Sequence, residues 1–182
     1  KGQYETSNGV EYPFGAKRFV DVAITDWFYP HVGYVSFLSM MTGVSDTEFA
    51  PNDTATRAMM VTILYRLAGT SDAAGDTSFR DVAPDSWYAK AAAWAEKQGI
   101  TAGFQDGTFR PDTSITREQF VTMLYSYASK QGYDVSARAD MSAFGDSQEI
   151  SGFAQEAMSW AVAVGLVSGS SNTTIAAKDT AK

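Results

Sequence analysis

The sequence predicts an all-α protein built from helix–loop–helix repeats, and two observations predict this fold class. The chain of 182 residues repeats itself at a spacing of about 60 residues. Each half of the clearest repeat also carries an apolar pattern of helical period. With 45% apolar residues the chain can bury a substantial core. We expect five helices, two in each of the first two repeats and one in the third, and no substantial sheet.

The repetition can be read directly in the sequence. Residues 19–27 read FVDVAITDW, and residues 79–87 read FRDVAPDSW. The same shift of 60 residues aligns many later positions, among them Gly43 with Gly103, Phe49 with Phe109, Pro51 with Pro111, Arg57 with Arg117 and Tyr65 with Tyr125. A third repeat begins at FGDS (residues 144–147) and aligns Trp160 with Trp94 at a shift of 66.

These alignments divide the chain into four parts. We expect an N-terminal extension (1–18), a first repeat (19–69), a second repeat (79–129) and a partial third repeat (144–182). Two helices bury little surface alone, so the repeats should pack on one another. The extension should pack on them through its aromatic residues, Tyr4, Tyr12 and Phe14.

The first helix of the second repeat has recognisable ends. Asp85 or Ser86 is suited to cap its start, and the helix should run to about Gln98. Gly99 then suits the position after the helix, as Gly165 does in the third repeat. A loop with Gly and Pro punctuation follows over residues 99–115.

The second helix of each complete repeat begins after a threonine. In the second repeat Thr116 is the N-cap, and Gln119 completes a capping box. In the first repeat Met59 occupies the equivalent place, so only half of that box should form.

The third repeat is predicted to be a weak point. Its helix has Trp160 and Val164 on an apolar face, and the sequence contains no second helix of that repeat to cover it. Exposing a contiguous apolar face is costly. Residues 1–18, another copy of the chain or a separate fragment should therefore complete the third repeat.

Composition excludes several classes of function. The net charge of −7 argues against nucleic acid, and no run approaches the roughly 18 apolar residues of a membrane span. The absence of cysteine and the single histidine, His31, remove most nucleophile–base and metal-site arrangements. We therefore predict no catalytic residues, no metal and no cofactor.

Arg57 and Arg117 occupy the first position of their helices. The helix dipole makes a cation unfavourable there, and such a conflict often marks function. One interpretation is that helix N–H groups and the guanidinium together bind an anion. The other is that each arginine pairs with a loop carboxylate such as Asp53 or Asp112.

These motifs resemble the S-layer homology repeat over about residues 19–179. The second repeat carries FRDV, Trp87, GITAG, DGTFRPD and ITREQ. The first carries FVDV, Trp27, MTGVSDTEFAPND and TRAMM, and the third carries FGDS and GLVSG. The resemblance implies a pseudo-threefold helical bundle. The chain departs from the family in having Glu118 where a small residue is usual.

The resemblance also implies a function and a site. Domains similar to this one anchor proteins, without catalysis, to secondary cell-wall polysaccharide, often bearing ketal-linked pyruvate, outside Gram-positive-type bacteria. The glycan lies in grooves between adjacent repeats, and a pyruvate carboxylate suits an arginine at a helix N-terminus. The residues carried over as glycan ligands are Arg57, Arg117, Trp27, Trp87, Gly43 and Gly103.

Structural alternatives exist for several of these positions, and two other functions remain open. Trp27 and Trp87 could belong to the core, and Asp21 and Asp81 could cap turns. A self-assembling scaffold of a surface layer is one alternative function. The other alternative is a non-catalytic region of a surface enzyme. The candidate carboxylate pairs are Asp76 with Asp81 and Glu149 with Glu156, and neither has the spacing of a catalytic pair.

Overall fold

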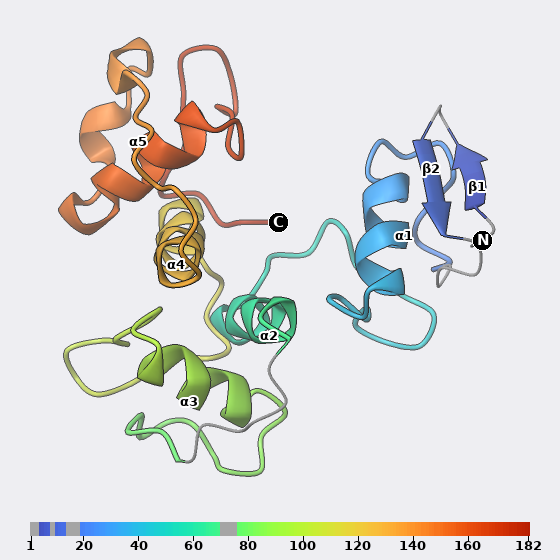
Figure 1. Cartoon of the computed structure of the whole chain (residues 1–182), viewed down its shortest axis with the longest axis horizontal. Coiled ribbons are helices and arrows are strands. Elements are labelled where there is room, and N and C mark those ends of the chain that lie inside the picture. The colour runs from blue at the N-terminus through green and yellow to red at the C-terminus, as the bar shows by residue number, and fades with distance from the viewer. Residues whose placement is uncertain (1–3, 8–9, 14–18, 70–75) are drawn as a thin grey trace. The chain divides into compact units, whose positions relative to one another are not determined.

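The computed structural model describes residues 4–7, 10–13, 19–69 and 76–182, with the backbone alone for the first two ranges. These residues form five α-helices and one two-stranded hairpin, so the all-α prediction is confirmed (Figure 1). The chain divides into an N-terminal unit (residues 1–53 with 182) and a C-terminal unit (residues 54–181). The division falls inside the first sequence repeat.

The N-terminal unit combines one helix with the hairpin. Strands β1 (Tyr4–Ser7) and β2 (Val10–Pro13) pair antiparallel, and β2 lies beside helix α1 (Tyr29–Phe37). The hairpin was not predicted. The side chains of Tyr4, Tyr12 and Phe14, which we expected to pack on the repeats, lie outside the described residues. A small core in this unit consists of Phe19, Val22 and Val32, with Phe28, Tyr29 and Phe49 packed against it.

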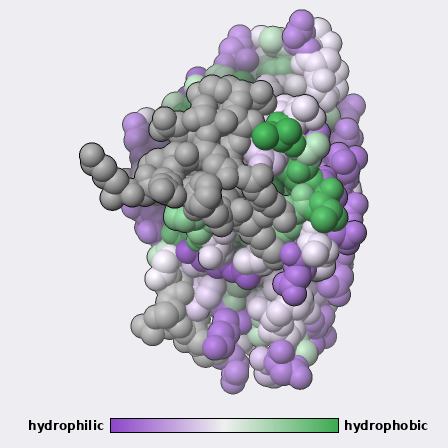
Figure 2. Space-filling view, turned by 90° about the vertical axis from the view of Figure 1, so that its right-hand side faces the viewer, coloured by the Kyte–Doolittle hydropathy of each residue, from purple (hydrophilic) through white to green (hydrophobic). Residues whose placement is uncertain are grey.

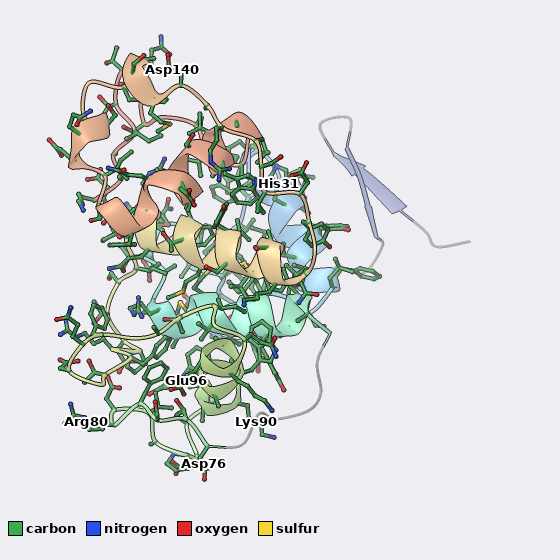
Figure 3. The ribbon with its side chains drawn as sticks, turned by 60° about the vertical axis from the view of Figure 1, so that its left-hand side comes forward. His31, Asp76, Arg80, Lys90, Glu96 and Asp140 are labelled. Carbon is green, nitrogen blue, oxygen red and sulfur yellow. The ribbon has the colours of Figure 1, made fainter. Side chains whose placement is uncertain are left out.

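The C-terminal unit is a stack of four helices in the order α5, α4, α2, α3 (Figures 1 and 3). Their bounds are α2 Arg57–Leu67, α3 Ala89–Lys97, α4 Arg117–Lys130 and α5 Gln155–Ala163. Three short 3-10 helices precede α5: η1 (Met141–Ala143), η2 (Ser147–Glu149) and η3 (Gly152–Ala154).

Helices α2 and α4 start as predicted. The Thr116 hydroxyl accepts a hydrogen bond from Gln119 N–H at 3.3 Å, and Gln119 Oε1 accepts one from Thr116 N–H at 3.4 Å. In α2 the Thr56 hydroxyl accepts from Met59 N–H. The prediction of only half a box there is wrong, because Met59 Sδ lies 3.5 Å from Thr56 N and serves as a weak acceptor.

The first helix of the second repeat starts later than predicted. Its N-cap is Tyr88, and Asp85 and Ser86 belong to the preceding turn, where Ser86 donates to the Ala83 carbonyl. The end of the helix is as expected, since Gly99 follows the C-cap at a φ of +68°.

Helices pair across repeats rather than within them. Helix α2 of the first repeat packs on α3 of the second, and α4 of the second packs on α5 of the third. The Tyr65 ring lies edge-on to Trp94 at 5.6 Å, and Tyr125 lies edge-on to Trp160 at 5.4 Å. The predicted packing of repeat on repeat is therefore confirmed within the C-terminal unit.

This pairing corrects the prediction for the third repeat. Trp160 is only 5% exposed, because α4 covers the face that we expected to be open. Val164, at the end of the helix, stays 45% exposed.

A closed ring of backbone hydrogen bonds joins the three repeats at their junction. Ile115 N–H donates to the Ala55 carbonyl, Ala181 N–H to Ile115, and Ala55 N–H to Ala181, at 2.8–2.9 Å. Ala55 and Ile115 each directly precede the threonine N-cap of their repeat. The ring ties one segment of each repeat to the other two within the C-terminal unit.

An aspartate at the start of each repeat holds the long loop of that repeat. Asp81 accepts hydrogen bonds from the N–H groups of Phe109 and Arg110, both at 2.7 Å. In the other repeats Asp21 accepts from the N–H groups of Phe49 and Ala50, and Asp146 accepts from those of Ile175 and Ala176. Asp21 and Asp81 therefore fix a turn, which was the structural alternative.

This aspartate contact makes the fold sensitive to acid. The hydrogen bond from Ile175 N–H, with that from Ala176, lowers the pKa of Asp146 below its ordinary value. A lowered pKa in the folded chain stabilises it above about pH 4, and this stabilisation is lost as the pH falls through the lowered pKa. Melting temperatures measured from pH 6 to pH 2 should fall in the acid range. The fall should be shallower in Asp146→Asn, and an equal fall in both proteins would contradict this assignment.

Candidate functional site

Arg57 lies at the junction of the first and second repeats. The N-cap Thr56 places it at the first position of α2, where its side chain reaches the loop of the second repeat. Its Nε–H donates to the Phe109 carbonyl at 2.7 Å. The guanidinium lies 4.7 Å from the ring centre of Phe104 and 5.0 Å from that of Phe109. These contacts bury the residue, which is 4% exposed.

The terminal nitrogens of Arg57 remain available. Among the described residues, Arg57 makes no other side-chain hydrogen bond and no ion pair. Within that part of the chain only one fully buried side-chain nitrogen or oxygen lacks a partner, Trp160 Nε1, so Nη1 and Nη2 of Arg57 are not fully buried. Nη1 and Nη2 carry four N–H bonds, and no described residue accepts from them.

The electrostatics of this site favour an anion. Burial, with a smaller effect of Arg110, lowers the pKa of Arg57 to about 10, so the residue is still cationic at neutral pH. The Arg110 guanidinium also lies over the Phe104 ring, 4.0 Å from its centre. Two cations thus contact one aromatic ring, and Asp106 pairs with Arg110 at 3.1 Å. The Thr108 hydroxyl and Arg110 hold the pKa of Asp106 at about 2.

Arg117 occupies the equivalent junction of the second and third repeats, where its side chain makes two hydrogen bonds instead of the one that Arg57 makes. Its Nε–H donates to the Ile175 carbonyl at 3.3 Å, and Nη2 donates to the Ser168 carbonyl at 2.8 Å. The third repeat has Ser170 and Ile175 where the second has Phe104 and Phe109, so no aromatic pair flanks this guanidinium.

Two sequence-based expectations about the arginines are wrong. Neither arginine pairs with Asp53, Asp112 or another carboxylate among the described residues, because loop carbonyls take that place. The helix N–H groups are not free to share an anion either. Those of Arg57 and Arg117 donate to the Thr113 and Asp179 carbonyls.

The predicted aromatic ligands are exposed. Trp27 is 80% exposed and Trp87 is 62% exposed, which excludes the core alternative for both. Trp87 packs edge-on against Tyr88 at 5.2 Å. The sequence analysis missed Phe153, which is 61% exposed and lies 66 residues after Trp87, so the repeat alignment could have found it.

The glycines Gly43 and Gly103 have a structural explanation. A Cβ on Gly103 would lie 2.4 Å from Phe79 and 2.6 Å from the Thr108 carbonyl. The equivalent distances at Gly43 are 2.5 Å to Phe19 and 2.6 Å to the Glu48 carbonyl. Each glycine therefore gives the first phenylalanine of its repeat room to pack, and its contact with a glycan stays a prediction.

The six predicted glycan ligands are divided between the two units. Arg57, Arg117, Trp87 and Gly103 all lie in the C-terminal unit, and Gly103 directly precedes the Phe104 that contacts Arg57. Trp27 and Gly43 lie in the N-terminal unit. The loop residues Phe104, Phe109 and Arg110 were not recognised, because only the fold brings them to an arginine from another repeat.

Glu118 departs from the family pattern for a structural reason. It is 3% exposed and pairs with Lys178 at 2.7 Å. Its carboxylate also accepts from the N–H and the hydroxyl of Ser151, both at 2.9 Å. The residue therefore ties α4 to the third repeat.

Other kinds of site find no support in the described part of the chain. No cluster there has three or more potential metal-ligating side chains. In those same residues no helix has the length and apolarity needed to cross a bilayer. Of the two carboxylate pairs considered, Asp81 is engaged with loop N–H groups and Glu156 lies 4.0 Å from Arg138.

Comparison with known proteins identifies the repeats. Residues 18–59 and 78–121 match the sequence model of the S-layer homology domain. These two segments are therefore S-layer homology repeats. The partial third repeat is related to them by its loop aspartate, its arginine contact and the hydrogen-bond ring.

Several characterised proteins contain similar segments. An endoglucanase of Bacillus sp. (strain KSM-635) is 31% identical over 167 residues, which is 92% of this chain and 18% of that enzyme. A cellulosome-anchoring protein of Acetivibrio thermocellus is 38% identical over 88 residues, 46% of this chain and 20% of that protein. The surface-layer 125 kDa protein of Lysinibacillus sphaericus is 30% identical over 128 residues, 70% of this chain and 10% of that protein. The chain thus spans a fifth or less of each of these relatives.

Proposed function

We propose that the chain is a non-catalytic anchoring module at the bacterial cell surface, and that it binds an anionic cell-wall polysaccharide at Arg57. The observation that carries this proposal is a buried guanidinium whose terminal nitrogens donate to no described residue and which has no carboxylate partner among those residues. A buried cation without a counterion is costly, and an anion that docks there offsets the cost.

The chemistry of the site favours a carboxylate on a sugar. A guanidinium presents a planar fork that matches a carboxylate, and the Phe104 and Phe109 rings keep it in one orientation. Ketal-linked pyruvate supplies such a carboxylate. Trp87 and Trp27 provide exposed aromatic surface for apolar faces of a sugar. Arg117 is a secondary ligand, because two carbonyls already accept from it.

The family and the relatives support the wider role. One relative is a cellulosome-anchoring protein and another a surface-layer protein. In the endoglucanase the similar segment accounts for 18% of the protein, which is consistent with an appended region. We place the chain outside the cell, on the wall or the surface layer of a Gram-positive-type bacterium.

The test is a titration of isolated wall polysaccharide with the wild type and Arg57 variants. A charge-assisted hydrogen bond contributes about 1.5–3 kcal/mol, so Arg57→Ala should bind roughly ten- to a hundredfold more weakly. Arg57→Lys should recover part of the loss, since an ammonium keeps the charge without the fork. Arg117→Ala should lose less than Arg57→Ala.

Two controls separate binding from folding and from net charge. Lys90→Ala removes an exposed cation from the same unit and should bind like the wild type. Each variant is titrated well below its own melting temperature. Equal binding of polysaccharide with and without pyruvate would reject the carboxylate ligand. Hydrolysis of the glycan would reject a purely non-catalytic role.

A further inference from the structure

The loop of the second repeat carries an arginine, Arg110, that the fold of the loop does not require. Exposed hydrophilic residues, drawn in purple in Figure 2, are common on the described surface, so exposure alone does not mark a site. Arg110 differs instead from its counterparts, which are Ala50 in the first repeat and Ala176 in the third. All three have a left-handed backbone, with φ of +56°, +57° and +53°, and the N–H of each donates to the aspartate at the start of its repeat. The same loop therefore forms with alanine in this place.

The Arg110 side chain is held in one orientation although 48% of it is exposed. Its guanidinium lies over the Phe104 ring at 4.0 Å from the ring centre. Nη2 donates to Asp106 Oδ2 at 3.1 Å, and Nε donates to the Thr108 hydroxyl at 3.3 Å. An exposed ion pair of this kind contributes little to stability. A side chain that is already oriented, however, loses less conformational entropy when a ligand binds to it.

The second repeat is the one repeat of the three that combines these side chains. The residues in the places of Phe104, Asp106 and Arg110 are Val44, Asp46 and Ala50 in the first repeat, and Ser170, Asn172 and Ala176 in the third. The third-repeat loop receives Arg117 as the second-repeat loop receives Arg57. The two junctions of the C-terminal unit therefore differ by one loop cation and by the ring beneath it.

Arg57 and Arg110 come from different repeats but share one aromatic ring. Their guanidinium carbons lie 4.7 Å and 4.0 Å from the centre of Phe104. After burial, the charge of Arg110 is the next cause that lowers the pKa of Arg57, so the two cations are close enough to repel each other. The neighbouring acids are already engaged, since Asp106 pairs with Arg110 and Asp81 accepts from loop N–H groups. An anion beside both guanidiniums would relieve their repulsion.

We propose that Arg110 is a second anion ligand beside Arg57, and that this junction selects a segment of wall polysaccharide that bears two carboxylates. The inference rests on the proposed function of Arg57. One carboxylate binds at the terminal nitrogens of Arg57, and the second binds at Nη1 of Arg110, from which no described residue accepts. The junction at Arg117, with Ala176 in its loop, takes a segment with one carboxylate.

Fragments of isolated wall polysaccharide serve as the probes, sorted by anion exchange into those with one carboxylate and those with two. Their binding to the intact chain is measured by isothermal titration calorimetry. The wild type should bind the two-carboxylate fragments roughly five- to twentyfold more tightly, because a half-exposed charged contact contributes less than a buried one. This preference should shrink as salt is raised from roughly 0.05 to 0.5 M, since exposed charges are screened.

Variants of the chain assign the preference to one side chain. Arg110→Ala should reduce it to about twofold, the statistical advantage of two equal groups, and should leave the affinity for one-carboxylate fragments nearly unchanged. Because both other repeats have alanine in this place, the fold should survive, and circular dichroism checks this. Arg110→Lys should keep part of the preference, since the charge remains without the fork. Lys90→Ala, which removes an exposed cation from α3, should keep it in full.

The outcomes separate this inference from the proposed function. If Arg57→Ala binds both kinds of fragment like the wild type, the proposed function itself is wrong. If Arg57→Ala weakens both but the wild type shows no preference for two carboxylates, or Arg110→Ala retains that preference, the inference is overturned and the proposed function stands. An equal loss for both kinds of fragment in Arg110→Ala would also overturn it, because Arg110 would then act only through Arg57.

Discussion

Phe109→Ala is expected to lower the free energy of unfolding of the C-terminal unit by about 3–5 kcal/mol, the usual cost of removing a buried aromatic ring. Phe109 is completely buried and stacks on Phe79 with ring centres 5.4 Å apart. Its ring also supports the Arg57 guanidinium at 5.0 Å. The substitution would therefore leave a cavity under the loop and release one side of the arginine.

Urea denaturation followed by circular dichroism measures this effect. Phe153→Ala is the matched control, because Phe153 is 61% exposed and its truncation should cost no more than about 0.5 kcal/mol. Similar midpoints for the two variants would show that the Phe109 ring contributes little to the core. At temperatures where Phe109→Ala is folded, it should also bind polysaccharide more weakly, since Arg57 loses its support.

Gly103→Ala should be the second strongly destabilising substitution, at about 2–5 kcal/mol. A Cβ there would lie 2.4 Å from the Phe79 ring and 2.6 Å from a backbone carbonyl, so the ring and the loop must move. Such overpacking typically costs about 1–3 kcal/mol. The left-handed backbone at this glycine adds about 1–2 kcal/mol for alanine.

Gly99→Ala separates the two contributions. Gly99 has the same φ of +68°, but its Cβ would meet only the end of Lys130, at 3.8 Å. Gly99→Ala should therefore lower the free energy of unfolding only by the cost of the left-handed backbone, about 1–2 kcal/mol. Equal losses of stability in Gly99→Ala and Gly103→Ala, measured by urea denaturation, would show that packing against Phe79 is not why glycine is required.

The helices of this chain and their ends could be predicted from the amino-acid sequence, because short-range features of the sequence determine them. The Thr116 N-cap, the Gly99 terminus and the apolar stripes each act within one or two helical turns. Their repetition at a fixed spacing, and the choice of Arg57 as a site residue, followed from the sequence for the same reason. The start of α3 was misplaced, because Asp85 and Ser86 favour a turn as readily as a helix cap.

The partner of each side chain was decided by tertiary packing. Sequence order suggested that the two helices of a repeat cover each other, and so Trp160 was expected to be open. The fold instead places Tyr125 of the preceding repeat on it. In the same way the sequence could show that Arg57 stands at a helix start, but not that its contacts would be Phe104 and Phe109 of the next repeat.

The repeated motifs and the helices are properties of short segments, and the sequence alone specifies them. Whether the Arg57 guanidinium meets a carboxylate or a backbone carbonyl depends on which loop the packing brings to it, and that loop lies about 50 residues further along the chain. Burial results from contacts between distant segments, and such contacts form only in the folded chain.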